Sequence, residues 1–200
     1  MCGATQLPDI YRKPSTLWSW HMSSTSIALQ LRDLFEATCY ELFTGLNGQI
    51  TQVESVDFDG SHMPFAHIDA GCNDFEIEIT LSLPFSALAM TYPVYCNITK
   101  IDESELEDWI TELSNRLMGQ LRRNLMMYSV QLQTGVPDHC FGYPSDPKST
   151  QTGYHFLFQF EFDAEVFEAG LFVEVFNPEL VFNMRAAEKN AINDGNIEFF

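Results

Sequence analysis

The chain has 200 residues, of which 46% are hydrophobic and 17 are Phe, so it can form one domain with a sizeable core. This composition excludes an intrinsically disordered chain, and no apolar run approaches the roughly 18 to 20 residues that a membrane-spanning helix needs. The formal net charge of −18 argues against binding to nucleic acid or anionic lipid, which favour a basic surface. We therefore expect a soluble protein whose partner is another protein.

The cysteines and the N-terminus indicate the compartment. Five cysteines are scattered along the chain, and none of them forms the C-x-x-C spacing of a zinc site. The first 20 residues lack the apolar block and the cleavage pattern of a signal peptide. These features predict reduced thiols in a cytoplasmic protein.

The first half of the chain contains one long helical pattern and several strand patterns. Residues 1–23 have no periodicity and form an expected N-terminal extension. Apolar residues at helical spacing then predict an amphipathic helix from Ser26 to about Gly45. Alternating or β-prone segments after it predict strands at about 49–58, 63–69 and 75–83, with a short helix at 85–91 after Pro84.

A second long helix has the clearest start signal. Ser104 to Glu107 matches a capping box, and the helix is expected to continue to about Asn124. Its expected core stripe consists of Leu106, Ile110, Leu113, Leu117 and Leu121.

The last third of the chain again has strand patterns. Strands are expected at 128–136, 154–163 and 171–176, and a turn at Ala169-Gly170 would join the last two. Asn177-Pro178 has the composition of a helix start, and that helix would end before Asp194-Gly195. These elements predict an α+β domain over residues 24–177, with two long helices packed on five or six mostly antiparallel strands. Residues 178–200 are expected to pack on the same domain as a helix or tail.

Two polar side chains on the second long helix form a candidate site. Glu112 and Asn115 are three residues apart, so a helix brings both to one surface patch. The spacing alone is weak, because Glu-x-x-Asn recurs at Glu174 and Asn177. That second pair falls on an expected strand, where residues three apart point to opposite faces. Only the first pair can act on one ligand.

The residues around this pair add specificity. Asp108 precedes Glu112 by four positions, Gly119 follows Asn115 by four, and Pro137 lies 22 positions after Asn115. In this order and spacing the chain resembles the CheC/CheX/FliY family of chemotaxis phosphatases, and it is most similar to CheX-like members. The resemblance covers about residues 26–176 in order of elements, and its specific residues lie between about 81 and 142.

The resemblance implies a function. It implies a hydrolase that removes the phosphoryl group from an aspartyl-phosphate on a CheY-like receiver domain in two-component signalling. Asn115 would orient the attacking water, and an amide suits this task because it donates and accepts hydrogen bonds without carrying charge. Glu112 would dock against a lysine of the receiver.

The same resemblance implies roles for three further residues, the source of the metal ion and the oligomeric state. Gly119 would let the partner approach closely, Asp108 would orient the neighbouring side chains, and Pro137 would shape the adjacent strand. The protein would need no cofactor or metal of its own, since Mg²⁺ would come with the phosphorylated receiver. A homodimer is also expected.

Some family members carry a second Glu/Asn pair on the first long helix. The corresponding segment here runs from Glu36 to Cys39, with a thiol in place of the amide. We therefore expect one active site.

Several other residues have simpler explanations. His139-Cys140 lacks a third orienting group for a nucleophile, and the remaining histidines lack metal-ligand spacing. Arg122-Arg123 is explained by the helix dipole and by solubility. The aromatic residues from Tyr154 to Phe162 are typical of a core, although they would also suit a subunit interface.

Two other function classes stay open. One is a non-catalytic module of a chemotaxis, flagellar-switch or other two-component system, which binds or scaffolds receivers without hydrolysis. The other is a small-ligand binder, which would require a deep apolar pocket away from Glu112 and Asn115.

Overall fold

A computed structural model describes residues 26–46, 48–54, 58–93, 102–142 and 153–182. These residues form three α-helices, one 3-10 helix and a seven-stranded sheet. In chain order the elements are α1 (Ile27–Gly45), β1 (Ile50–Gln52), η1 (Gly60–His62), β2 (Pro64–Gly71), β3 (Phe75–Ser82), α2 (Phe85–Thr91), α3 (Glu103–Met126), β4 (Gln133–Thr134), β5 (Asp138–Phe141), β6 (Tyr154–Phe162) and β7 (Glu165–Val175).

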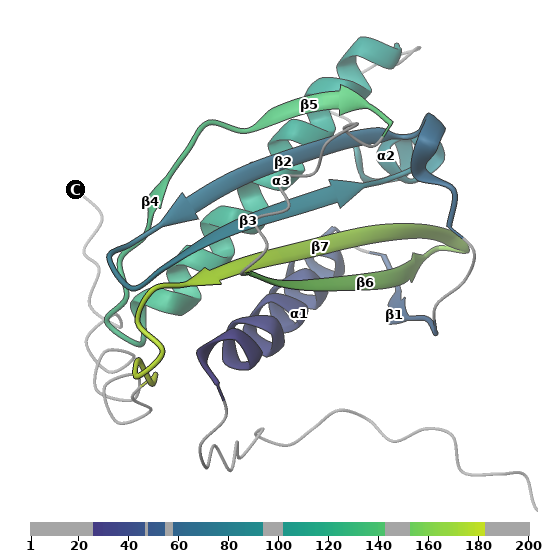
Figure 1. The fold of residues 1–200 in the computed structure, drawn as a ribbon. Coiled ribbons are helices and arrows are strands. Elements are labelled where there is room, and N and C mark those ends of the chain that lie inside the picture. Colours follow the sequence, from purple (N-terminus) through teal and green to yellow (C-terminus); the bar gives the residue numbers. More distant parts are fainter. Residues whose placement is uncertain (1–25, 47, 55–57, 94–101, 143–152, 183–200) are drawn as a thin grey trace, which may run out of the picture.

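The sheet has the strand order β1-β6-β7-β3-β2-β4, and β5 also pairs with β2. All of these pairings are antiparallel. Helix α1 packs on β6 and β7, and α3 packs on β2 and β3, so both long helices cover the same face (Figure 1). The predicted α+β architecture is confirmed, with one strand more than expected.

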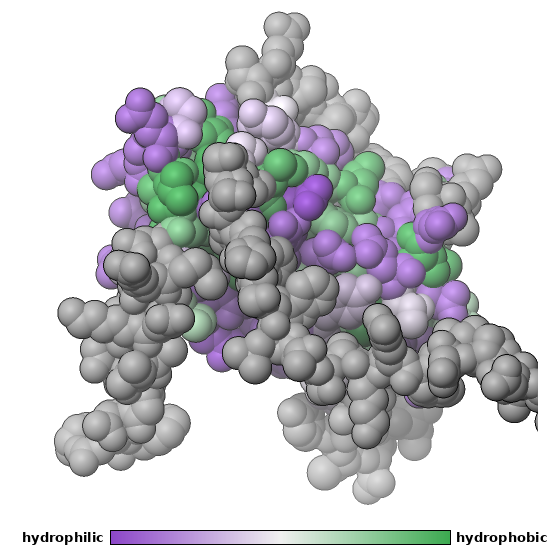
Figure 2. Space-filling model, turned by 90° about the horizontal axis from the view of Figure 1, so that it is seen from below, coloured by the Kyte–Doolittle hydropathy of each residue, from purple (hydrophilic) through white to green (hydrophobic). Residues whose placement is uncertain are grey.

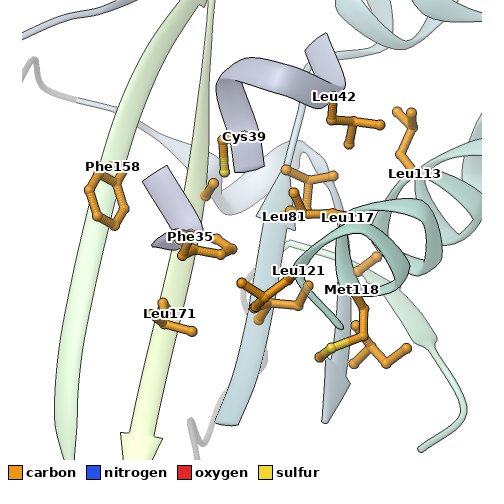
Figure 3. Close-up of a cluster of buried hydrophobic side chains, with 14 of the residues drawn as sticks. Phe35, Cys39, Leu42, Leu81, Leu113, Leu117, Met118, Leu121, Phe158 and Leu171 are labelled. Carbon is orange, nitrogen blue, oxygen red and sulfur yellow. The ribbon is translucent and has the colours of Figure 1, made fainter. Parts of the chain in front are cut away.

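Helix α1 has the predicted limits, with Ser26 as its N-cap. Its apolar stripe is buried against the sheet and against α3, as the close-up of the core shows (Figure 3). Leu31, Phe35 and Phe43 are all completely buried, and the ring of Phe43 lies 4.4 Å from that of Phe167 on β7.

Strand β3 forms the centre of the core, and its predicted alternation is confirmed. Phe75, Ile77, Ile79 and Leu81 are each at most 1% exposed, because they face the two helices. The short helix α2 follows with the predicted limits of 85–91.

Helix α3 begins earlier than predicted. Its N-cap is Asp102, whose carboxylate accepts the Glu105 N–H at 3.0 Å, while the Glu105 carboxylate accepts the Asp102 N–H at 3.0 Å. The predicted box at Ser104 is therefore wrong, because an equally good Asp-x-x-Glu box lies two residues upstream. The Ser104 hydroxyl instead donates to Asp102. The helix continues to Met126, and its predicted core stripe is confirmed.

Two predicted strands are much shorter in the structure. The segment at 49–58 contributes only β1, since Val53 and Glu54 lie outside any strand and residues 55–57 lie outside the described residues. The segment at 128–136 contributes only β4, because the chain first turns at Ser129, which has a φ of 65°. Strand β5 was not predicted.

The last hairpin turns at a different place from the one predicted. Its turn lies at Asp163 and Ala164, both with positive φ, and β7 runs without interruption through Ala169-Gly170. Gly170 is required by packing and not by a turn: a Cβ there would lie 2.3 Å from the Thr80 hydroxyl.

The predicted C-terminal helix is absent from the part that the structure describes, which reaches Phe182. Asn177 caps a turn instead, accepting the Glu179 N–H at 3.2 Å and donating to Asp74 at 2.8 Å. Phe182 is buried and stacks on Tyr128, so this part of the tail packs on the domain. Residues 1–23 and 183–200 lie outside the described residues.

None of the described helices has both the length and the apolar character required to cross a bilayer.

Candidate functional site

The outward face of α3 carries the residues that the sequence motif singled out. Asp108, Glu112, Asn115 and Gly119 are all exposed, whereas the opposite face of the same helix is buried. Their spacings of four, three and four residues keep them on one stripe of the helix surface. The structure therefore brings these four residues together on one face.

Glu112 is held by a neighbour on its own helix. Its Oε1 accepts a hydrogen bond from the Nε of Arg116 at 2.7 Å, an ion pair at i, i+4 spacing. Both side chains are about half exposed, 45% for Glu112 and 44% for Arg116, so the pair stabilises the helix by only about 0.3–0.5 kcal/mol. Its main effect is to restrict the Glu112 rotamer. The bond uses one carboxylate oxygen and leaves the other for a partner.

Arg116 in turn lies on an aromatic ring. Its guanidinium carbon is 4.8 Å from the ring centroid of Trp109, which is 5% exposed. The indole N–H of Trp109 donates to the Thr91 hydroxyl at 3.0 Å, and Thr91 donates to backbone carbonyls of α2. A continuous set of contacts therefore connects α2 to the Glu112 carboxylate.

Asn115 is differently placed. Its carboxamide has no hydrogen-bond partner among the described residues. An exposed amide without an internal partner keeps both its N–H and its C=O groups for a water molecule or a ligand. One turn further on, a Cβ added to Gly119 would meet nothing within 4 Å, so the glycine is not needed for packing inside this chain.

Pro137 lies in a bulge at the edge of the sheet. Strand β4 pairs Thr134 with Ala70, whereas β5 pairs Asp138 with His67. Between these two pairs, the three residues 135–137 lie opposite only two residues of β2, 68 and 69. Proline fits here because a bulge on an edge strand does not require its missing N–H. Helix α3 packs against both β2 and β5. Pro137 thus lies at an edge of the sheet that is next to α3.

The second Glu/Asn position on α1 does not form a surface pair. Cys39 is completely buried and points into the core (Figure 3), and this burial raises the pKa of its thiol. Glu36 is half-buried, and burial together with the nearby Asp33 raises the pKa of its carboxyl. Among the described residues, α3 alone presents a Glu/Asn pair on one helix face.

His139 and Cys140 lie exposed on β5. Partial burial of the sulfur, with a smaller contribution from Asp138, raises the pKa of the Cys140 thiol, and its Sγ lies 3.3 Å from the Gly142 carbonyl. This environment disfavours the thiolate that a nucleophile requires. No group of three His, Cys, Asp or Glu side chains suited to a metal ion occurs in the described part of the chain.

The aromatic residues of β6 divide into two groups. Phe158, Phe160 and Phe162 are buried in the core, whereas Tyr154 is 49% exposed. Leu157, on the other face of the strand, is 55% exposed. Seen from below, on the side of β6 and α1, hydrophobic residues form several separate groups between hydrophilic ones (Figure 2).

The cavities do not favour a small-ligand binder. A cavity of about 370 Å³ lies beside the β2–β3 hairpin, and its lining is mainly polar. It is formed by Gly71, Cys72, Asn73, Glu76, Gln131 and Gln133. This polar lining differs from the deep apolar pocket that a small-ligand binder would require.

Arg116 and Trp109 were not predicted from the sequence. The i, i+4 spacing of Glu112 and Arg116 was a usable signal, because this arrangement commonly forms an ion pair on a helix. The role of Trp109 had no such signal, since its contact with α2 depends on tertiary packing.

No protein-family model and no curated protein matches the sequence. Solved structures do match over almost their whole length. The chain has the CheC/CheX fold.

Three of these structures show the extent of the match. A CheC-like superfamily protein from Shewanella sp. PV-4 has a TM-score of 0.59 at 14% identity, covering 73% of this chain and 98% of that one. Chemotaxis protein CheX from Vibrio vulnificus has a TM-score of 0.60 at 13% identity, covering 72% and 97%. CheX from Desulfovibrio desulfuricans has a TM-score of 0.57 at 13% identity, covering 72% and 99%. The resemblance inferred from the sequence motif is confirmed at the level of the fold.

Proposed function

We propose that this protein dephosphorylates the phosphoaspartate of a CheY-like receiver domain, with Asn115 and Glu112 as its catalytic residues. The observation that carries the proposal is the exposure of both side chains on one face of α3, in a chain with the CheC/CheX fold. In this role α3 docks over the phosphorylated site of the receiver.

Asn115 orients the attacking water. Hydrolysis of an acyl phosphate requires a water in line with the leaving carboxylate, so catalysis consists mainly of positioning. The Asn115 amide has no internal partner to compete for the water. The receiver supplies the phosphoaspartate and its Mg²⁺.

Glu112 fixes the docking register. Its second carboxylate oxygen accepts a hydrogen bond from a lysine of the receiver, while Arg116 keeps the first. Because the Glu112–Arg116 pair is exposed and weak, the incoming lysine does not have to displace a strongly held partner.

The test is phosphate release from phosphorylated receiver domains encoded by the same genome. Asn115→Ala should reduce the accelerated release by at least about a hundredfold, the loss typical of removing a positioned catalytic group. Its folding should not change, because Asn115 is exposed. Asn177→Ala is an asparagine control from the other Glu-x-x-Asn segment.

The outcomes separate the two remaining functions. Equal release by wild type and Asn115→Ala would remove Asn115 from the mechanism. Stable binding of a phosphorylated receiver without acceleration by the wild type would favour the non-catalytic binding module.

A further inference from the structure

The basic residues of the described chain are concentrated on one helix. The described residues include four Lys or Arg side chains, and Arg116, Arg122 and Arg123 all lie exposed on α3. The fourth, Arg32, is on α1 and pairs with Asp33. Asp and Glu far outnumber these residues in the same part of the chain. A basic surface in so acidic a protein needs an explanation.

Arg122 and Arg123 lie on the same side of α3 as the candidate site, two turns further along the helix. Arg122 follows Asn115 by seven residues, and Arg123 follows Arg116 by seven, which places each about 10 Å further along the same side. Neither guanidinium has an ion pair or hydrogen bond with any described residue. Met126, one turn after Arg122, adds an apolar side chain that is 50% exposed.

The helix dipole explains only part of this arrangement. Arg123 lies in the last turn of α3, where a cation is favoured by a few tenths of a kcal/mol, but Arg122 lies before it. The acidic residues of α3 occupy its first half, so the outward face changes sign close to Glu112 and Asn115. A partner that docks there must be complementary to both halves.

We infer that Arg122 and Arg123 form a second docking contact, which binds carboxylates on the surface of the same receiver domain beside its phosphorylation site. The inference rests on the proposed function and extends it to partner recognition. The occupant is an acidic protein surface because arginine forks match carboxylates, and because Met126 offers an adaptable apolar contact beside them. Electrostatic complementarity of this kind accelerates association and selects among related partners.

The test is binding of the full chain to receiver domains of the same genome, activated with beryllofluoride and Mg²⁺, by calorimetry at low and at 0.5 M salt. Arg122→Gln/Arg123→Gln should weaken binding about tenfold at low salt. The difference should become small at high salt because exposed charges are screened there. Arg122→Lys/Arg123→Lys keeps the charge but not the fork, so it should recover only part of the affinity.

A matched control makes the same change of net charge elsewhere. Gln49→Glu/Gln52→Glu also lowers the charge by two, at exposed positions in and beside β1, at the opposite edge of the sheet from β4. It should bind as wild type does. Equal weakening in the control and the arginine variant would show an effect of net charge alone and overturn the inference.

Kinetics separate this inference from the proposed function. On phosphorylated receivers the arginine variant should lose kcat/KM and keep kcat, whereas Asn115→Ala should lose kcat. If the wild type binds receivers but releases no phosphate, the proposed catalysis is wrong. The docking contact is then still tested by the binding affinities of the wild type and the arginine variant. If the arginine variant binds as tightly as wild type at low salt, the docking contact fails alone. If no receiver binds, both fail.

Discussion

At the scale of single residues, the outward face of α3 carries groups that the interior of the protein does not use. Asn115 has no internal hydrogen-bond partner, Glu112 has one oxygen engaged, and Gly119 has open space above it. Each of these features costs stability or contributes almost none to it. A functional surface explains them better than a structural one.

Gly119 gives the clearest test at this scale. Glycine in a helix interior costs about 0.5–1 kcal/mol relative to alanine, and nothing lies within 4 Å of a Cβ added at this position. Gly119→Ala should therefore raise the free energy of unfolding by about that amount, measured by urea titration. It should also weaken receiver binding several-fold, because the methyl group blocks close approach.

Gly45→Ala is the control, since a Cβ at Gly45 also meets nothing within 4 Å but lies at the end of α1. It should not change receiver binding. A Gly119→Ala variant that binds as well as wild type would show that the partner does not approach this turn.

At the scale of elements, α3 combines a rigid attachment with a polar outward face. Its buried side packs on the sheet, while hydrogen bonds from Gln120 and Asn124 connect it to α1 through Glu41 and Thr38. Trp109 connects it to α2. A site built on a helix fixed in this way keeps its geometry better than one on a loop.

The capping box sets where this helix begins, and Asp102 is its centre. Asp102→Ala removes the acceptor for the Glu105 N–H and should lower the free energy of unfolding by about 1 kcal/mol. Ser104→Ala, which removes only the hydrogen bond to Asp102, should cost clearly less. Chemical denaturation of both variants measures the difference. A larger loss of stability for Ser104→Ala than for Asp102→Ala would indicate that Ser104 is the N-cap.

At the scale of the whole molecule, the dominant feature is negative charge. The sequence carries a formal net charge of −18, and some acidic residues face each other directly across the sheet. Asp69 on β2 is opposite Glu78 on β3. Like charges at such positions destabilise a sheet, and the effect is greatest at low salt.

Glu78→Gln tests this cost. The variant should raise the free energy of unfolding by about 0.2–1 kcal/mol at low ionic strength, and the gain should shrink in 0.5 M NaCl. Glu161→Gln makes the same change of net charge opposite Val166, where no acid faces it on β7. Thermal melts at both salt concentrations compare the two. If both variants gain the same stability, overall charge is the cause, and the pairing of Glu78 with Asp69 has no effect of its own.

The sequence by itself determined the two long helices, the buried face of β3 and the Glu112/Asn115 pair. Each depends on local periodicity, in which the spacing of residues along one segment fixes which of them share a face. The CheC/CheX fold was implied instead by the resemblance of the residues from Asp108 to Pro137 to that family's motif, and the solved structures confirm the fold.

Tertiary structure decided the features that involve two distant segments. The last hairpin turns at Asp163-Ala164, and Gly170 lies inside β7, where a Cβ would meet the hydroxyl of Thr80, 90 residues earlier in the chain. The β4–β5 bulge exists because both strands pair with β2 in different registers. Trp109, on whose ring Arg116 lies, is also hydrogen-bonded to Thr91 of α2, 18 residues earlier in the chain. Contacts across such separations depend on packing and loop closure, which no local pattern encodes.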